Sequence, residues 1–222
     1  MKVEGYQVAA AMVVYHTYGL MKKAIQSVRK FYPDLAFTVI DNTEGIASGS
    51  VRRWAKNNRV KIIRAGANIG HGPGMNVALW ETEADVLLML DSDTEMYKPG
   101  LLEDALALIP DMKTVWYGIG PILPLKRPVG GEAKVPYLHA STCLLRVGQY
   151  RLFEPFTDHG LALLAPMYEL RIKELETMLV KFPVEDYVHH FWRGTRDFCR
   201  GNKVKRSYDD RKSKSWWEPG KF

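Results

Sequence analysis

Four strand-like apolar segments alternate with helix-like segments in the first half of the sequence, and this alternation restricts the fold more than any other feature. The strand-like segments are Val8–Tyr15, Ala36–Asn42, Arg59–Ala65 and Ala84–Asp91. Between the first two, Leu20–Tyr32 places apolar residues at helical spacing and stops before Pro33. Strands and helices in this order are typical of parallel βαβ units. We therefore predict an α/β fold with a twisted, mainly parallel sheet and helices on both faces.

The second half of the sequence is less regular, and we predict that it completes the same domain. Helices are predicted over Leu101–Ile109 and over most of Gly160–Leu179. Strands are predicted over Thr114–Leu123 and Tyr137–Val147, and a last one begins in Val184–Thr195 and runs into a loop. Together these segments predict a single domain over residues 1–196, followed by a basic, aromatic C-terminal tail over residues 197–222.

The positive charge of the chain is concentrated near its C-terminal end. Residues 193–222 hold 10 basic and 4 acidic side chains, whereas residues 1–192 hold 21 of each, so the last segment supplies the whole net charge of +6. This segment also carries Trp216 and Trp217. A basic, aromatic segment suits an anionic membrane surface or a nucleic acid. The alternative is a solvated tail that only aids solubility.

Cysteine content and hydropathy indicate the cellular setting. Cys143 and Cys199 are too few for a disulfide framework, and no Cys/His spacing is typical of a zinc site. No apolar run approaches the length that spans a bilayer. We therefore expect a cytoplasmic protein, with peripheral membrane contact if the tail binds a membrane surface.

Polar side chains follow all four predicted strands of the first half. Thr17 follows the first strand, Asp41 ends the second, Asn68 follows the third, and Asp91 and Asp93 end the fourth. Each of these residues by itself could simply belong to a turn. In an open α/β sheet, however, ligands bind at the carboxyl ends of the strands. The sequence therefore predicts that these side chains converge on one ligand-binding edge.

The two aspartates of "LMLDSDTE" point to a cation. Side chains two residues apart on an extended segment share a face, so Asp91 and Asp93 lie on the same side. Two anions this close repel each other unless a cation or a proton separates them. The alternative is a strand end whose carboxylates accept hydrogen bonds from turn N–H groups.

A glycine-rich segment, "NIGHGPGMN" over Asn68–Asn76, precedes the fourth strand. Its glycines let the backbone approach a ligand, and a helix predicted from about Met75 would offer its N-terminus to an anion. The spacing matches neither the dinucleotide nor the Walker pattern. His71 is more typical of a loop residue than of a metal ligand. The alternative is a loop that only connects a strand to a helix.

In this order, the segments resemble the GT-A fold glycosyltransferases of family 2. The resemblance covers Gln7 to Arg196, and its most specific part is the glycine-rich loop followed by an apolar strand and D-x-D. The late "H-x-x-R-G-T" over His190–Thr195 is similar to the end motif of the rhamnosyltransferase-like members. The motifs that carry it are "VVYHTY", "TVIDN", "NIGHGPGMN", "LLMLDSDTE", "STCLLRV", "FEPFTDHG" and "YVHHFWRGT".

The resemblance implies a metal-dependent glycosyltransferase that moves a sugar from a UDP-, GDP- or dTDP-linked donor to an acceptor hydroxyl. Inversion of the anomeric centre would follow from attack opposite the leaving group. Asp91 and Asp93 would hold Mn²⁺ or Mg²⁺ on the diphosphate, because hard oxygen ligands suit these ions. His190 would be a further contact to the metal or diphosphate. His189 is the alternative, and as strand neighbours only one of them can reach the site.

The resemblance also implies roles in donor binding. Thr17 would lie by the nucleotide, and Asp41 would hydrogen-bond the base. The glycine-rich loop would lie along the ribose and the sugar, and its candidate residues are Asn68, Gly70, Gly72 and Asn76.

A carboxylate is also implied as the base that takes the proton from the acceptor hydroxyl. Asp158 in "PFTDHG" stands at the matching position, but this chain has Thr157-Asp158-His159 where the family often shows Glu-Asp. Asp158 could instead cap the helix that follows it, and Glu185 and Asp186 are rival bases. The acceptor could be a glycan, a lipid-linked glycan, a protein, a small molecule or a modified nucleic acid.

Two other classes remain open from the sequence. A haloacid-dehalogenase-like phosphatase would use Asp91 as its nucleophile, but it resembles this chain at one motif only. In that class the motif normally opens the fold, whereas here three strand-helix units precede it. A non-catalytic nucleotide-sugar-binding module would keep the fold without the reaction.

Overall fold

The computed structural model describes residues 1–45, 48–125, 135–157 and 161–191. Asp158 and the C-terminal tail therefore lie outside the described residues. None of the helices within the described ranges is long and apolar enough to cross a bilayer.

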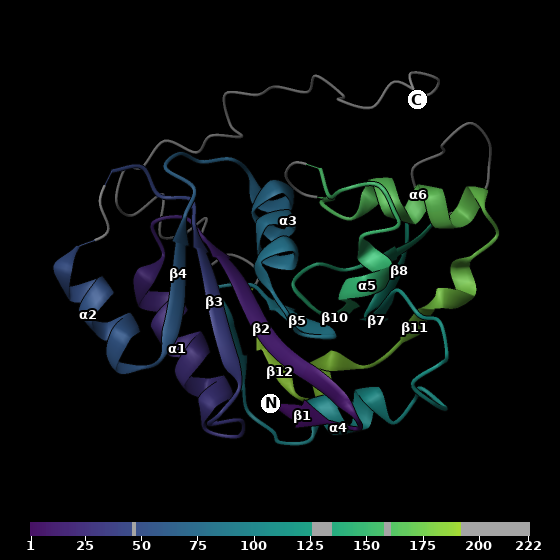
Figure 1. Cartoon of the computed structure of the whole chain (residues 1–222), viewed down its shortest axis with the longest axis horizontal. Helices are drawn as coiled ribbons and strands as arrows, with labels where there is room; N and C mark the ends of the chain where they lie inside the picture. Colours follow the sequence, from purple (N-terminus) through teal and green to yellow (C-terminus); the bar gives the residue numbers. More distant parts are fainter. Residues whose placement is uncertain (46–47, 126–134, 158–160, 192–222) are drawn as a thin grey trace.

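The core of the molecule is a mixed sheet with the strand order β11-β7-β10-β5-β2-β3-β4. Four of its strands come from the first half of the chain and run parallel: β2 (Tyr6–Val14), β3 (Ala36–Asp41), β4 (Val60–Arg64) and β5 (Val86–Leu90). Figure 1 shows these four strands side by side. The predicted parallel sheet is confirmed, and its strands have their carboxyl ends on one edge.

The second half of the chain extends this sheet beyond β5. β10 (Thr142–Arg146) runs antiparallel to β5 and to β7 (Gly118–Gly120), and β11 (Leu179–Lys181) runs parallel to β7. A short β1 (Lys2–Val3) pairs antiparallel with β2.

Helices cover both faces of the sheet, as predicted. Alternate residues of a strand point to opposite faces. In β5, accordingly, Leu88 and Leu90 enter one buried cluster, and Leu87 and Met89 enter the other. The first cluster contains side chains of α1 (Tyr18–Arg29), α2 (Gly49–Asn57) and α4 (Leu101–Leu106). The second contains side chains of α3 (His71–Glu81), α5 (Val147–Tyr150) and α6 (Leu164–Ile172).

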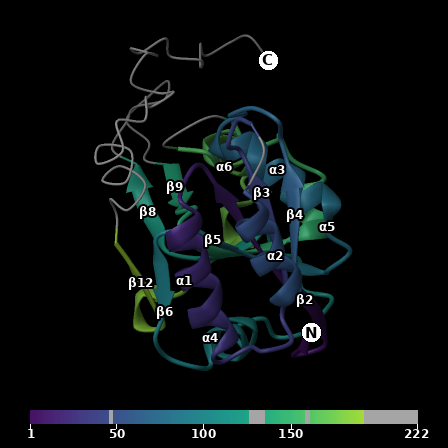
Figure 2. The ribbon, with the colours of Figure 1, turned by 90° about the vertical axis from the view of Figure 1, so that its left-hand side faces the viewer.

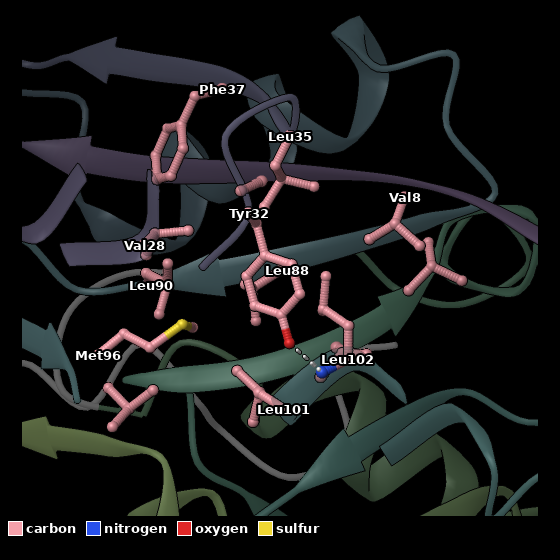
Figure 3. Close-up of a cluster of buried hydrophobic side chains, with 14 of the residues drawn as sticks. Val8, Val28, Tyr32, Leu35, Phe37, Leu88, Leu90, Met96, Leu101 and Leu102 are labelled. Carbon is pink, nitrogen blue, oxygen red and sulfur yellow. Dashed lines mark hydrogen bonds between the residues drawn. The ribbon is translucent and has the colours of Figure 1, made fainter. Parts of the chain in front are cut away.

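A tyrosine ties the first cluster to the start of α4. In Figure 3 the Tyr32 ring lies among apolar side chains, and its hydroxyl accepts a hydrogen bond from the Leu102 N–H at 3.1 Å. The same hydroxyl donates to Glu103 at 2.7 Å. The buried polar group therefore has both a donor and an acceptor as partners.

Several predicted elements have different bounds in the structure. α3 begins at His71 rather than near Met75, so most of the predicted glycine-rich loop is helical. The predicted strand Tyr137–Val147 is two strands, β9 (Val135–Leu138) and β10, separated by a turn, and β9 pairs with β8 (Ile122–Leu125).

The predicted helix over Gly160–Leu179 is also shorter than expected. α6 ends at Ile172, because Glu174 adopts a positive φ of 57° that an α-helix cannot continue. A 3₁₀ turn (Glu176–Met178) then leads into β11.

The last predicted strand is realised as a 3₁₀ turn (Val184–Asp186) followed by β12 (Val188–His190). β12 pairs antiparallel with β6 (Thr94–Met96), which directly follows the two aspartates. Figure 2 shows β6 and β12 side by side. β6 is held against α1, where the Met96 N–H donates to Ser27 Oγ at 2.9 Å. This small sheet connects the end of the described chain to the end of β5.

Candidate metal centre and its surroundings

The turn between β5 and β6 presents the two aspartates and is fixed by backbone hydrogen bonds. The Asp91 N–H donates to the Ser141 carbonyl at 2.8 Å, and Thr94 Oγ1 donates to the Asp91 carbonyl at 2.8 Å. On the other side, the Phe191 N–H donates to the Asp93 carbonyl at 3.0 Å. Three separate parts of the chain therefore meet at this turn.

Three residues, Asp91, Asp93 and His190, form what we call the metal group: their candidate ligand atoms all lie within 4.8 Å of one another. His190 Nε2 lies 3.2 Å from Asp93 Oδ1 and 3.5 Å from Asp91 Oδ2. The Asp93 side chain is 8% exposed, whereas that of Asp91 is 26% exposed, so solvent reaches the group past Asp91. Two carboxylates and an imidazole suit a divalent cation such as Mn²⁺ or Mg²⁺. The residues present therefore fit the predicted metal.

His189 faces away from this group. The pairing of β12 with β6 sets His190 opposite Thr94, and the alternation of side chains turns its neighbour to the other face. His189 is exposed, and its ring lies edge-on to Phe191 with the ring centroids 4.6 Å apart. Of the two candidate histidines, the structure brings His190 to the aspartates.

His71 also lies in this region, as the first residue of α3 rather than in the predicted loop. Its Nε2 lies 3.3 Å from Asp91 Oδ1, whereas His190 lies nearer to the other oxygen of this carboxylate, Oδ2. Burial lowers the pKa of His71, but the hydrogen bond to Asp91 and the negative charges of Asp91 and Asp93 outweigh it, so this pKa is raised. Its position after the third strand was the only sequence signal for this placement.

His139 is a third histidine in the same electrostatic environment. Its Nδ1 lies 2.8 Å from Ser141 Oγ, and the carbonyl of the same serine accepts the hydrogen bond from the Asp91 N–H. Burial lowers the pKa of His139; Asp91 opposes this effect, and His190 and His71 add to it. Nothing in the sequence singled out His139, because its place depends on the turn between β9 and β10.

Thr17 is hydrogen-bonded to the turn that carries the two aspartates. Its side chain is fully buried, and its Oγ1 is hydrogen-bonded to Ser92 Oγ at 2.9 Å. Ser92 is the residue between the two aspartates. In this structure, therefore, the Thr17 hydroxyl faces the protein.

The Asp41 carboxylate is also fully buried and already has hydrogen-bond donors. The Tyr18 hydroxyl donates to Oδ2 at 2.8 Å, with a longer contact of 3.1 Å to Oδ1, and the Thr43 N–H donates to Oδ1 at 3.0 Å. Burial raises the pKa of Tyr18, and Asp41 adds to this effect. The partly exposed Tyr18 therefore lies directly against Asp41, the aspartate predicted to bind the nucleotide base.

Three residues of the glycine-rich segment fix the start of α3. Gly70 has a positive φ of 98°, which favours glycine, and its N–H donates to Asn68 Oδ1 at 3.2 Å. Its carbonyl accepts from Asn42 Nδ2 at 2.8 Å. At Gly72, an added Cβ would lie 1.5 Å from the Thr157 carbonyl oxygen. Close approach to protein, rather than to a ligand, explains the glycine at position 72.

Asn76 holds the segment that leads to Asp158. Its Nδ2 donates to the Phe156 carbonyl at 2.8 Å, and its Oδ1 accepts from the Phe156 N–H at 2.9 Å and from the Tyr150 hydroxyl at 2.7 Å. The Thr157 N–H donates to the Ala162 carbonyl at 3.0 Å. Phe156 and Thr157, the residues just before Asp158, are thus held against α3.

The rival bases lie elsewhere. Glu185 and Asp186 are exposed in the 3₁₀ turn before β12, at the other end of that strand from His190. The Glu185 carbonyl accepts a hydrogen bond from the exposed Tyr97 hydroxyl. The structure does not bring these two carboxylates to the metal group.

The sequence profile described as "Glycosyl transferase family 2" matches residues 10–123, which include part of β2, all of β3, β4 and β5, and both aspartates. A comparison with curated proteins gave no significant match.

Several solved structures have a fold similar to that of this chain at low sequence identity. A mannosyltransferase from Pyrobaculum calidifontis, in complex with GDP-Man and Mn²⁺, has 16% identity and a TM-score of 0.60 over 80% of this chain. S. aureus TarS (residues 1–349) has 16% identity and a TM-score of 0.56 over 89% of this chain. Glucosyl-3-phosphoglycerate synthase from Mycobacterium tuberculosis, in complex with Mn²⁺, UDP-glucose and phosphoglyceric acid, has 12% identity and a TM-score of 0.57 over 80%.

The chain is shorter than these structural relatives. It covers 55% of the mannosyltransferase, 64% of the TarS fragment and 69% of the synthase.

Proposed function

The chain belongs to glycosyl transferase family 2, and on this premise we propose that it moves a sugar from a nucleotide-diphosphate donor to an acceptor hydroxyl in a metal-dependent reaction. The predicted GT-A fold is confirmed by the family match and by the structural similarity. The narrower resemblance to rhamnosyltransferase-like members stays a prediction. The observation that carries the proposal is the group formed by Asp91, Asp93 and His190 at the carboxyl end of β5.

We assign the cation to this group, with Mn²⁺ or Mg²⁺ as the ion. A divalent cation bound there would neutralise the charge that builds up on the departing diphosphate. Asp91 and Asp93 would bind it through carboxylate oxygens, and His190 through Nε2. The greater exposure of Asp91 supports entry of the diphosphate from that side. Two of the three structural relatives described above are in complex with Mn²⁺ and a nucleotide-sugar.

The donor would lie along the carboxyl ends of β5, β2 and β3. Asp41, whose carboxylate accepts a hydrogen bond from Tyr18, is the candidate residue for binding the nucleotide base. Thr17 would act by holding Ser92 and so the turn that carries the aspartates. The start of α3, with Asn68, would lie towards the ribose and sugar. UDP-, GDP- and dTDP-linked sugars all remain donors to test.

We propose Asp158 as the base that removes the proton from the acceptor hydroxyl. This residue lies outside the described residues, and the support comes from its neighbours. Asn76 holds Phe156, and Gly72 contacts the Thr157 carbonyl, next to His71 and the metal group. Attack of the hydroxyl opposite the leaving diphosphate would invert the anomeric centre.

The proposals for the acceptor and the location rest on the sequence alone. A hydroxyl of a glycan, a lipid-linked glycan, a protein, a small molecule or a modified nucleic acid is the proposed acceptor class. A cytoplasmic protein with peripheral membrane contact through the basic tail over residues 197–222 fits the charge distribution. The tail lies outside the described residues.

The proposal is tested by incubating the protein with a panel of nucleotide-sugars and Mn²⁺ and measuring the released nucleotide diphosphate. Slow hydrolysis of one donor, abolished by EDTA and reduced at least ~100-fold in Asp93→Ala, is the expected result, because a bound cation contributes several kcal/mol of charge stabilisation. Asp34→Ala is the matched control, since Asp34 is an exposed carboxylate near the start of β3, away from the carboxyl edge.

Two outcomes would contradict the proposal. Release of phosphate from simple esters without use of any nucleotide-sugar would indicate the phosphatase class with Asp91 as the nucleophile. Binding of a nucleotide-sugar without turnover, in the presence of Mn²⁺ and a broad set of acceptors, would indicate a binding module.

A further inference from the structure

Asp91 is the more exposed of the two aspartates, so its carboxylate needs a partner to hold one orientation. The terminal torsion of an aspartate is broad and roughly twofold, which means that rotamer preference alone does not fix the carboxylate plane. Asp93 is 8% exposed and is enclosed by its neighbours, whereas Asp91 is 26% exposed. An oxygen that turns away from the metal group would be lost as a ligand.

His71 is placed to hold this carboxylate. Its Nε2 lies 3.3 Å from Asp91 Oδ1, while Asp91 Oδ2 is the oxygen near His190, at 3.5 Å. The two oxygens of Asp91 therefore have different neighbours. Nε2 carries a proton both in the imidazolium form and in one neutral tautomer, so the contact does not depend on the charge of His71.

The backbone around His71 is fixed on both sides. Before it, Gly70 is held by hydrogen bonds to Asn42 and Asn68. After it, Gly72 contacts the Thr157 carbonyl so closely that no side chain fits. His71 is also the first residue of α3, so its Cα position is set by the helix start. The imidazole therefore projects from a rigid base and is pre-organised for Asp91.

We propose that His71 is a positioning residue for Asp91: its Nε2–H holds Oδ1 and keeps Oδ2 turned towards His190 and the cation. The inference rests on the proposed metal-dependent function. In it, His71 orients a metal ligand and does not itself bind the cation. Hydrogen-bond partners of this kind orient metal ligands, and their removal typically weakens metal affinity about 10- to 100-fold.

The test measures Mn²⁺ binding by isothermal titration calorimetry, without any nucleotide. His71→Leu removes the donor and should weaken Mn²⁺ binding about 10- to 100-fold. His71→Gln keeps an N–H donor at a similar reach and should restore affinity to near that of the wild type. His71→Asn, whose shorter amide does not reach Oδ1, should behave like His71→Leu and keeps the test open if the leucine variant does not fold. Circular dichroism verifies that each variant is folded.

A second titration with inorganic pyrophosphate, in the presence of saturating Mn²⁺, separates positioning from direct phosphate binding. Unchanged Mn²⁺ affinity in folded His71→Leu would overturn the proposal, and weaker pyrophosphate binding in that variant would assign His71 to the diphosphate instead. A glutamine variant as weak as the leucine variant would also overturn it. If the wild-type protein binds no Mn²⁺, the metal-dependent function fails together with this inference, whereas a wild-type protein that binds normally leaves only the inference at risk.

Discussion

His190 Nε2 lies 3.2 Å from Asp93 Oδ1, although the two residues are 97 positions apart in the sequence. The contact depends on the register of β12 against β6, in which His190 stands opposite Thr94, the residue after Asp93. A shift of one residue in this pairing would replace His190 with a residue facing the other way. The short two-stranded sheet thus determines whether the metal group has two or three members.

This register gives a matched pair of substitutions. His190→Ala should weaken Mn²⁺ binding about tenfold or more, which corresponds to ~1.4 kcal/mol. His189→Ala should leave binding unchanged, because that side chain is exposed on the opposite face of β12. Calorimetric titration of both variants with Mn²⁺ provides the measurement. Equal losses in the two variants would show that the strand, rather than the imidazole, is responsible.

Metal binding should also be visible as thermal stability. The wild-type melting temperature should rise with Mn²⁺ and return to its starting value with EDTA, since a ligand at 100 times its Kd adds ~2.7 kcal/mol to the folded state. Asp93→Asn should show no such rise. In the absence of metal the same variant should be at least as stable as the wild type, because it removes repulsion between two neighbouring carboxylates. Differential scanning fluorimetry with and without EDTA measures both effects.

Gly72 should not accept a side chain. An alanine Cβ would lie 1.5 Å from the Thr157 carbonyl oxygen, so the backbone on one side must move, at a cost of about 1–3 kcal/mol or more. Gly19→Ala in α1 is the control, because no atom lies within 4 Å of the added methyl group, and it should be neutral or stabilising by up to ~1 kcal/mol. Urea denaturation of both variants gives the comparison. A Gly72→Ala protein as stable as the wild type would contradict the close contact.

Asn76 should matter more for turnover than for donor binding. Asn76→Ala leaves the Phe156 N–H and carbonyl and the Tyr150 hydroxyl without their partner, at a cost of about 1–3 kcal/mol for each group that stays buried. The segment leading to Asp158 would lose its anchor, so we expect kcat to fall while the donor KM changes little. Tyr150→Phe removes only one of the three hydrogen bonds and should lower the free energy of unfolding by about 0.5–1.5 kcal/mol. A larger loss of kcat in Tyr150→Phe than in Asn76→Ala would refute the role of Asn76 as the anchor of this segment.

The first half of the fold was predictable because its signals are local. Leu87 to Leu90 form a continuous apolar run of strand length, and the parallel topology implied by the intervening helices puts Asp41, Asp91 and Asp93 on one edge. The alternation of β12 likewise separates His189 from His190. These inferences need only periodicity and strand direction.

The remaining features depend on contacts between elements that are far apart in sequence. β6 and β12 have three residues each, which is too short for an alternating pattern to be recognised. Glu174 has a positive φ just after α6, and glutamate is not a residue from which such a helix end is predicted. The partners of Asn76 and the contact of His71 with Asp91 follow from where α3 packs, and no local pattern predicts that packing.

The pairing of β12 with β6 also has a consequence for how the protein is made. During synthesis, Asp91 and Asp93 leave the ribosome long before His190, so the nascent chain first holds only part of the metal group. On the proposed assignment of His190 to the cation, binding at full strength requires the docking of β12, the last strand of the described chain. Metal uptake would then follow the docking of β12, and a bound cation would stabilise only molecules in which β12 is paired with β6.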